Sequence, residues 1–130
     1  MASVTIFCVD PRVPAIAKQI LDELEPGNSE AYTTTAIGGS LNISGELQKI
    51  ATMVEKLDVT RVNMVDHLTC AAFRMAFGEK DLEEEEGLHR EYMKKAVLQV
   101  KQHFPDVDVR ACLLNSATPE ALAPELVEVN

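Results

Sequence analysis

The chain is 130 residues long and strongly acidic, with 21 Asp and Glu against 12 Lys and Arg and a net charge of −9. This length fits one domain with its own apolar core, and the acidic charge excludes the phosphate backbone of nucleic acids and anionic membrane surfaces as partners. The apolar runs are far too short to span a bilayer, so we expect no membrane contact.

The apolar pattern predicts strands that alternate with helices. Short β-branched runs are typical of buried strands, and apolar residues at every third or fourth position are typical of helices. Pro14 suits a first helical turn, Ser44 is expected to cap the next helix, and Pro105 ends the last one. In chain order, the prediction is a strand over 3–9, a helix over 13–24, a strand over 30–36, a helix over 44–57, a strand over 59–65 that leads to His67, a helix over 88–104 and a strand over 107–114.

This order of elements predicts an α/β fold. Right-handed crossovers would give a mainly parallel four-stranded sheet with helices on both faces, in one domain over residues 1–130. Residues 71–87 receive no firm element, and residues 115–130 are expected to form a loosely ordered tail. In such sheets, ligands bind beyond the carboxyl ends of the strands, where the strand order reverses.

Two short motifs hold the residues that are typical of a metal site. Cys8-Val9-Asp10-Pro11-Arg12 follows the first predicted strand, and His67-Leu68-Thr69-Cys70 follows the third. Two thiolates and one imidazole are preferred ligands of Zn²⁺, and three protein ligands leave a fourth position open. Both motifs lie at carboxyl ends of predicted strands, so we expect them to meet if those two strands are neighbours.

The first residues and the cysteines favour the cytoplasm. Residues 1–7 lack the basic start and the long apolar segment of a secretory signal. The chain has three cysteines, an odd number, and two of them are in the motifs. Because a reducing compartment would keep these thiols free to bind metal, we expect a cytoplasmic protein.

The motif pair resembles the zinc site of the β-class carbonic anhydrases, which is built from Cys-x-Asp-x-Arg and, about sixty residues later, His-x-x-Cys. The segment between the motifs is also similar to that family. It has a turn at Pro26-Gly27, Tyr32 on the following predicted strand, and a loop of small residues that ends in Gly38-Gly39. The resemblance covers residues 4–70 and implies a β-carbonic-anhydrase-like fold.

The resemblance implies a zinc-dependent lyase that reversibly hydrates CO2 to bicarbonate. Cys8, His67 and Cys70 would be the Zn²⁺ ligands, and Asp10 and Arg12 would be the catalytic dyad. Zinc lowers the pKa of a bound water to about 7, so that zinc-bound hydroxide can attack CO2. Asp10 would orient this hydroxide while Arg12 keeps Asp10 ionised. In some members of the family the same Asp is instead the fourth ligand of a closed site.

The resemblance also implies a pocket and a partner. Tyr32, Gly38, Gly39 and Ala71 would line the pocket of a small-molecule substrate, either CO2 and bicarbonate or a related linear molecule. Active sites of the family lie at a dimer interface. We therefore expect a homodimer or a higher homo-oligomer.

Departures from the family keep two alternatives open. The family has Gly before the ligand His and Gly-Gly after the second ligand Cys, where this chain has Asp66, Ala71 and Ala72. One alternative is a non-catalytic zinc-binding or interaction protein of the same fold. The other is a hydrolase of carbonyl sulfide or carbon disulfide.

The remaining side chains with chemical potential are expected to be structural. Cys112 lies in an apolar run and is expected in the core. Asp66, beside His67, is interpreted as a solvated charge at a strand end, and the alternative is a residue that supports the metal ligands from behind. His89 and His103 are expected on the exposed side of their helix, and residues 83–86 on a solvated helix start, where carboxylates favour the helix dipole.

Overall fold

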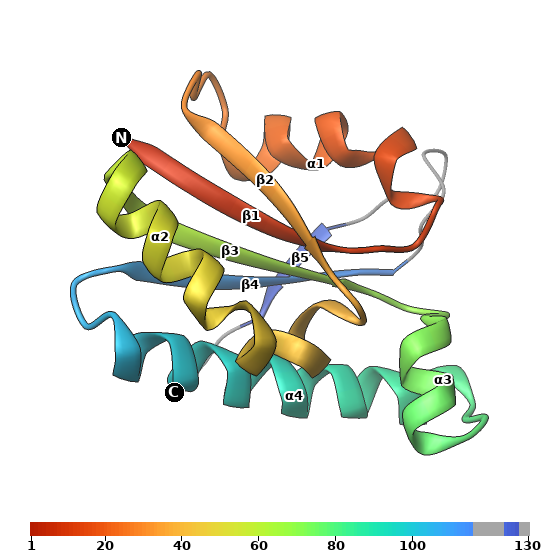
Figure 1. The fold of residues 1–130 in the computed structure, drawn as a ribbon. Helices are drawn as coiled ribbons and strands as arrows, with labels where there is room; N and C mark the ends of the chain where they lie inside the picture. Colours follow the sequence, from red (N-terminus) through yellow and green to blue (C-terminus); the bar gives the residue numbers. More distant parts are fainter. Residues whose placement is uncertain (116–123, 128–130) are drawn as a thin grey trace.

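The computed structural model describes residues 1–115 and 124–127, and its centre is a sheet in the order β2-β1-β3-β4-β5 (Figure 1). The first four strands run parallel, and β5 runs antiparallel to β4. The predicted α/β fold with a mainly parallel sheet is therefore confirmed. The strands are β1 (Ala2–Cys8), β2 (Ala31–Ala36), β3 (Val59–His67), β4 (Asp108–Leu114) and β5 (Pro124–Val127).

The sheet thus has five strands where four were predicted. The additional strand, β5, lies within the predicted tail and pairs with the outer edge of β4, where Val127 is buried opposite Ala111. This strand was not predicted because a segment of four residues that includes Pro124 and Glu125 is too short and too polar to show the apolar alternation typical of a strand. Residues 116–123 and 128–130 of the predicted tail lie outside the described residues.

Helices cover both faces of the sheet, as predicted (Figure 1). One face carries η1 (Val13–Ala15) and α1 (Ala17–Leu24). The other face carries η2 (Gly39–Glu46), α2 (Leu47–Leu57) and α4 (Leu82–His103), and α3 (Ala71–Phe77) follows the end of β3. None of the helices in the described part of the chain combines the length and apolarity needed to cross a membrane.

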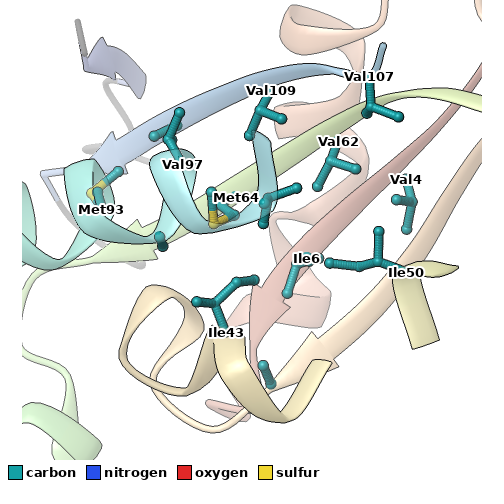
Figure 2. Packing of buried hydrophobic residues seen from close by; sticks show 14 of the residues in the cluster. Val4, Ile6, Ile43, Ile50, Val62, Met64, Met93, Val97, Val107 and Val109 are labelled. Carbon is teal, nitrogen blue, oxygen red and sulfur yellow. The ribbon is translucent and has the colours of Figure 1, made fainter. Parts of the chain in front are cut away.

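Side-chain alternation along the strands gives two apolar layers. On β1, Val4 and Ile6 face the layer of α2 and α4, whereas Phe7 packs with Ile16 and Ile20 on the side of α1. Figure 2 shows the larger layer, where Val4 and Ile6 lie among residues of β3, β4, α2 and α4. Helices on both faces bury β1 along its whole length.

Two helix starts differ from the prediction. Helix α4 begins at Leu82 instead of residue 88 because the Asp81 carboxylate caps it, accepting the amide of Glu84 at 2.8 Å. Ser44 does not cap α2, which begins at Leu47; its hydroxyl is hydrogen bonded to Gln99 instead. Both segments are rich in polar residues, so apolar periodicity does not mark where the helices start.

The strand order reverses at β1. The chain moves from β1 to β2 on one side of the sheet and then crosses to β3 on the other side (Figure 1). The predicted pairing of the first and third strands is therefore present, with Ile6 opposite Met64. As a result, Cys8 at the end of β1 lies beside the end of β3, where the second motif begins.

Candidate metal centre

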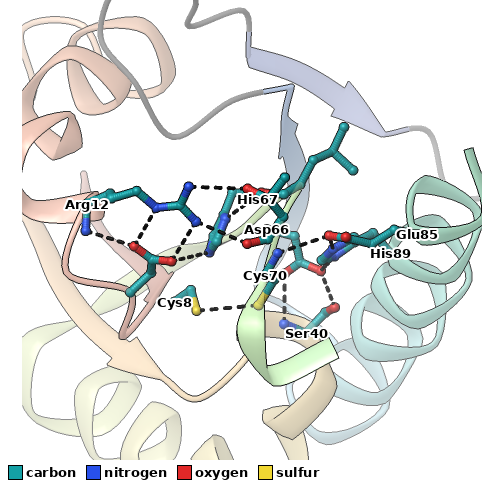
Figure 3. Close-up of polar contacts among 11 residues, drawn as sticks. Cys8, Arg12, Ser40, Asp66, His67, Cys70, Glu85 and His89 are labelled. Atoms are coloured by element: carbon teal, nitrogen blue, oxygen red, sulfur yellow. Dashed lines mark hydrogen bonds and ion pairs between the residues drawn. The ribbon is translucent and has the colours of Figure 1, made fainter. Parts of the chain in front are cut away.

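Cys8, His67 and Cys70 come together at the carboxyl ends of β1 and β3 (Figure 3). Their ligand atoms all lie within 4.8 Å of one another, and the two Sγ atoms are 3.8 Å apart. Cys8 and His67 are the last residues of their strands, and Cys70 precedes the first residue of α3. All three side chains are buried. The two motifs therefore meet as the sequence predicted, and they form a group that could hold a metal ion.

One nitrogen of His67 lacks a partner. Its Nδ1 lies 2.9 Å from the carbonyl oxygen of Leu68 and donates to it, because a carbonyl can only accept. This bond leaves Nε2 as an acceptor, and Nε2 is buried without a hydrogen-bond partner. Burial of an unpaired polar atom lowers the stability of the fold unless an ion or a water molecule binds to it. A bare imidazole nitrogen beside two thiols fits the ligand chemistry of zinc.

The electrostatics of the three side chains also suit a cation. The thiol of Cys70 hydrogen bonds to Cys8 and lowers the pKa of Cys8 to about 4, although burial opposes this change. The same hydrogen bond, together with burial, raises the pKa of Cys70. Burial opposes the charged form of His67, but the Cys8 sulfur and the Leu68 carbonyl outweigh it and raise the pKa of His67. The pair therefore favours a thiolate at Cys8, and Cys70 would lose its proton when a metal binds.

Asp10 and Arg12 form a bidentate ion pair beside these residues. Arg12 Nε and Nη2 donate to Oδ1 and Oδ2 of Asp10 at 3.0 and 2.8 Å, and the Arg12 amide donates to Oδ1 at 2.8 Å. These hydrogen bonds from Arg12 lower the pKa of Asp10 to about 2. Asp10 Oδ2 lies 3.7 Å from Nε2 of His67. An ionised carboxylate thus faces the unpartnered nitrogen.

Thr69 links Arg12 to the second motif, a role that was not predicted from the sequence. Nη1 of Arg12 donates to Thr69 Oγ1 at 3.2 Å, and Nη2 donates to the Thr69 carbonyl at 3.1 Å. Thr69 has a φ of 59°, which is unusual for a β-branched residue. Strain of this kind is typical of functional loops. The only signal in the sequence is the position of Thr69 between two ligand-type residues.

A cavity of about 300 Å³ adjoins the site on the side of α1, and its walls include Cys8, Asp10, Val13, Ala17 and residues 33–35. The predicted lining residues Tyr32, Gly38, Gly39 and Ala71 are not among its walls.

The side chain of Tyr32 lies on the other face of the sheet from α1. Tyr32 pairs with Val4, whose side chain faces the α2 side of the sheet, whereas Thr35 pairs with Phe7, which faces α1. Gly38 acts on the site through its backbone, which contributes to the lowered pKa of Cys8. Ala71 is the exposed first residue of α3, directly after Cys70.

A buried polar network lies behind Cys8, His67 and Cys70, and the predictions for its members were wrong. Figure 3 shows the polar contacts that join Asp66, Glu85 and His89. These side chains are 1%, 3% and 1% exposed, not solvated. The partners of Asp66 come from distant segments, Ser40 and His89, so no local pattern reveals them. The available signal was the spacing of Glu85 and His89, which lie four residues apart and therefore on one side of a helix.

Two other expectations are met. Cys112 is buried in the layer beneath α1, and burial raises its pKa to about 12. His103 is exposed near the end of α4, where its Nδ1 lies 2.9 Å from the Gln99 carbonyl. Neither residue lies in the candidate site.

No protein-family model matches the chain, and no curated protein matches it in sequence. Solved structures of carbonic anhydrases share its fold. A carbonic anhydrase from Glaciozyma antarctica matches with a TM-score of 0.62 and 15% identity over 94% of this chain and 80% of that one. A β-carbonic anhydrase of the fungus Aspergillus fumigatus matches with a TM-score of 0.61 and 18% identity, over 95% of this chain and 74% of that one. A β-carbonic anhydrase isoform of the protozoan Trichomonas vaginalis matches with a TM-score of 0.61 and 14% identity, over 96% and 81%. At such low identity the likeness establishes the fold: the chain shares the fold of the β-carbonic anhydrases.

Proposed function

We propose that the protein is a zinc-dependent lyase that interconverts CO2 and bicarbonate. One observation carries this proposal: Cys8, His67 and Cys70 converge around an unpartnered imidazole nitrogen, directly beside the Asp10–Arg12 pair. The three similar structures named above are carbonic anhydrases, which supports the same reaction class.

Each residue of the site has a proposed role. Cys8, His67 and Cys70 would hold Zn²⁺ and leave a fourth position open. When bound, zinc lowers the pKa of a coordinated water to about 7 and so supplies a nucleophile at neutral pH. The Asp10 carboxylate would accept a hydrogen bond from this water, or serve as the fourth ligand in a closed state. Arg12 keeps Asp10 ionised and aimed, because it donates to both of its oxygens.

The cavity beside the site suits a small uncharged substrate. Phe7, Val13 and Ala17 make its walls largely apolar, and Cys8 and Asp10 of the candidate site also line it. A linear molecule such as CO2, carbonyl sulfide or carbon disulfide needs no charged partner to enter it. CO2 is the substrate that agrees with the carbonic anhydrase fold of the similar structures.

We also propose that the protein works as a homodimer with this site near the interface. Val9 and Ile37, which follow β1 and β2, are 50% and 61% exposed, and both lie beside the site. Within the described residues, no strand pairs with the outer edge of β2. Exposed apolar side chains next to an open sheet edge favour association.

Elemental analysis and stopped-flow kinetics test the proposed reaction. Protein purified without added metal should contain one zinc per chain and should hydrate CO2 faster than buffer alone. Asp10→Asn should keep the zinc and lose about 100-fold or more in rate, the usual contribution of a positioned proton acceptor. Cys70→Ser should lose the zinc as well.

Zinc-loaded protein without CO2 hydration would contradict the proposal. Sulfide release from carbonyl sulfide or carbon disulfide would then identify the related hydrolase. If neither substrate reacts and chelation only lowers the melting temperature, the zinc is structural and the protein is a non-catalytic member of the fold.

A further inference from the structure

We propose that Asp66, His89 and Glu85 form a positioning network that sets the metal affinity of the site, an inference that rests on the metal centre proposed above. The network joins the end of β3, helix α4 and the start of α3. None of its members is a proposed metal ligand.

The network is continuous from the η2 loop to Cys70 (Figure 3). Asp66 Oδ1 accepts the Ser40 amide at 2.9 Å, and Asp66 Oδ2 accepts the Ser40 hydroxyl at 2.5 Å. His89 Nδ1 lies 2.8 Å from Asp66 Oδ2, and His89 Nε2 lies 3.0 Å from Glu85 Oε2. The same Glu85 oxygen accepts the Cys70 amide at 3.0 Å. The His89 imidazole thus connects the carboxylate of Asp66, beside His67, with the carboxylate of Glu85, which accepts the Cys70 amide.

The network contacts the segments that bear two of the three candidate ligands. Asp66 directly precedes His67, and Glu85 holds the backbone of Cys70. Asp66 also fixes Ser40 in the turn that leads from β2 into η2. A shift of α4 would therefore reach both His67 and Cys70.

Space in this region is matched to the Asp66 carboxylate. A Cβ atom on Gly39 would lie 2.4 Å from Asp66 Oδ1 and 3.1 Å from the Val65 carbonyl. On the other side, the ring of His89 stacks against Phe73 of α3, with the ring centroids 3.8 Å apart. The network is therefore held on both sides, as a group that positions ligands must be.

The energetics also point to a role beyond stability. Two carboxylates at 1% and 3% exposure carry a large desolvation cost, and apolar residues of similar size often stabilise a core at least as well. Residues that hydrogen bond to metal ligands have a role of this kind, because their loss typically weakens metal binding 10- to 100-fold. The position of this network, directly behind His67 and Cys70, matches that role.

Cobalt binding to the Glu85→Gln variant tests the network. Gln keeps the volume of Glu but replaces the charged acceptor of the Cys70 amide with a weaker neutral one. The affinity for Co²⁺, measured from thiolate-to-cobalt absorption, should fall at least tenfold. Glu84→Gln is the matched control, because it makes the same chemical change at an exposed position in the same turn of α4. The Glu84→Gln variant should bind Co²⁺ with the affinity of the wild type.

A merely structural role would give a different result. If Glu85→Gln lowers the melting temperature of the metal-free protein but leaves Co²⁺ affinity unchanged, the inference is overturned. If the variant does not fold, Ser40→Ala decides by the same measurement, because it removes one donor to Asp66 at the far end of the network. Unchanged Co²⁺ affinity in that folded variant overturns the inference, and a severalfold loss supports it.

The readout also separates this inference from the proposed reaction. Wild-type protein that binds no Co²⁺ overturns both the metal centre and the network. Wild-type protein that binds Co²⁺ but does not hydrate CO2 overturns the proposed reaction alone, while the affinity of Glu85→Gln still decides on the network.

Discussion

Glu25 shows how a single buried charge holds the sheet together away from the metal centre. Its Oε2 atom accepts from Arg110 Nη2 at 2.7 Å, Asn63 Nδ2 at 2.9 Å and Arg61 Nη1 at 3.4 Å. Burial opposes ionisation, but Asn63, Asn28 and the two guanidinium groups outweigh it and lower the pKa of Glu25 below its ordinary value of 4.5. Glu25 thereby connects the end of α1 with β3 and β4.

Replacing Glu25 with Gln should therefore destabilise the protein at neutral pH. We expect a loss of about 3 kcal/mol in the free energy of unfolding, the lower end for a broken buried ion pair, because both arginines are partly solvated. A pKa below 4.5 means that the charge stabilises the fold fully above pH 4.5 and that this contribution is lost as the pH falls through the folded-state pKa. Urea unfolding of the variant and the wild type at pH 7 and at acidic pH measures both effects.

The matched control is Glu23→Gln, on the exposed side of α1. It should change the free energy of unfolding by less than about 0.5 kcal/mol at either pH. A Glu25→Gln variant as stable as this control at pH 7 would show that the cluster around Glu25 contributes nothing net. A difference that grew toward acidic pH would contradict the direction of the pKa shift.

Among the elements, the turn from β2 into η2 shapes the wall behind the metal centre. Gly38 and Gly39 both have positive φ, at 77° and 57°. Only glycine adopts this conformation freely, and Gly39 also leaves room for the Asp66 carboxylate. The turn therefore fixes Ser40 against Asp66 and directs the chain away from β2 into η2.

Gly39→Ala should be strongly destabilising and Gly45→Ala should not. An alanine at 39 combines backbone strain with a clash against Asp66, so we expect a loss of about 2–4 kcal/mol in the free energy of unfolding. Gly45 lies in the same η2 element, has no positive φ, and would give an added Cβ no neighbour within 4 Å. Denaturant unfolding of both variants measures the contrast, and equal stability of the two would refute the account of this turn.

The sequence predicted those parts of the fold that depend on local pattern. Apolar periodicity marks β1, β3 and the apolar face of α4, and the turn chemistry around Gly27 marks the end of α1. The start of α4 and strand β5 were not predictable in this way, because charged and short segments show no period.

The candidate site likewise has residues that the sequence predicted and residues that it did not. The convergence of Cys8, His67 and Cys70 was predictable because their chemistry is distinctive and their motifs lie at strand ends. The burial of Asp66 and His89 was not, because it depends on partners from segments far apart in the chain, brought together only by the fold. Buried polar contacts of this kind leave no periodic signal in a single sequence.

At the scale of the whole molecule, charge and exposed apolar surface act against each other. Each chain carries a net charge of −9, so two copies repel one another over distances set by the salt concentration. Val9 and Ile37 offer the opposing apolar contact at the ends of β1 and β2. Association of two copies should therefore strengthen as added salt screens the repulsion.

The proposed dimer can be tested through Ile37. Light scattering should give twice the chain mass of 14.3 kDa for the wild type, and Ile37→Glu should give the mass of one chain. A two-fold interface contains each substituted residue twice, so the variant places two further negative charges in the contact and removes two apolar ones. Leu98→Glu is the control, because Leu98 is 50% exposed on α4, away from the site, and its substitution should leave the mass unchanged. A wild-type mass of one chain at high salt would contradict the dimer, and dissociation by the Leu98 variant alone would place the interface on α4 instead.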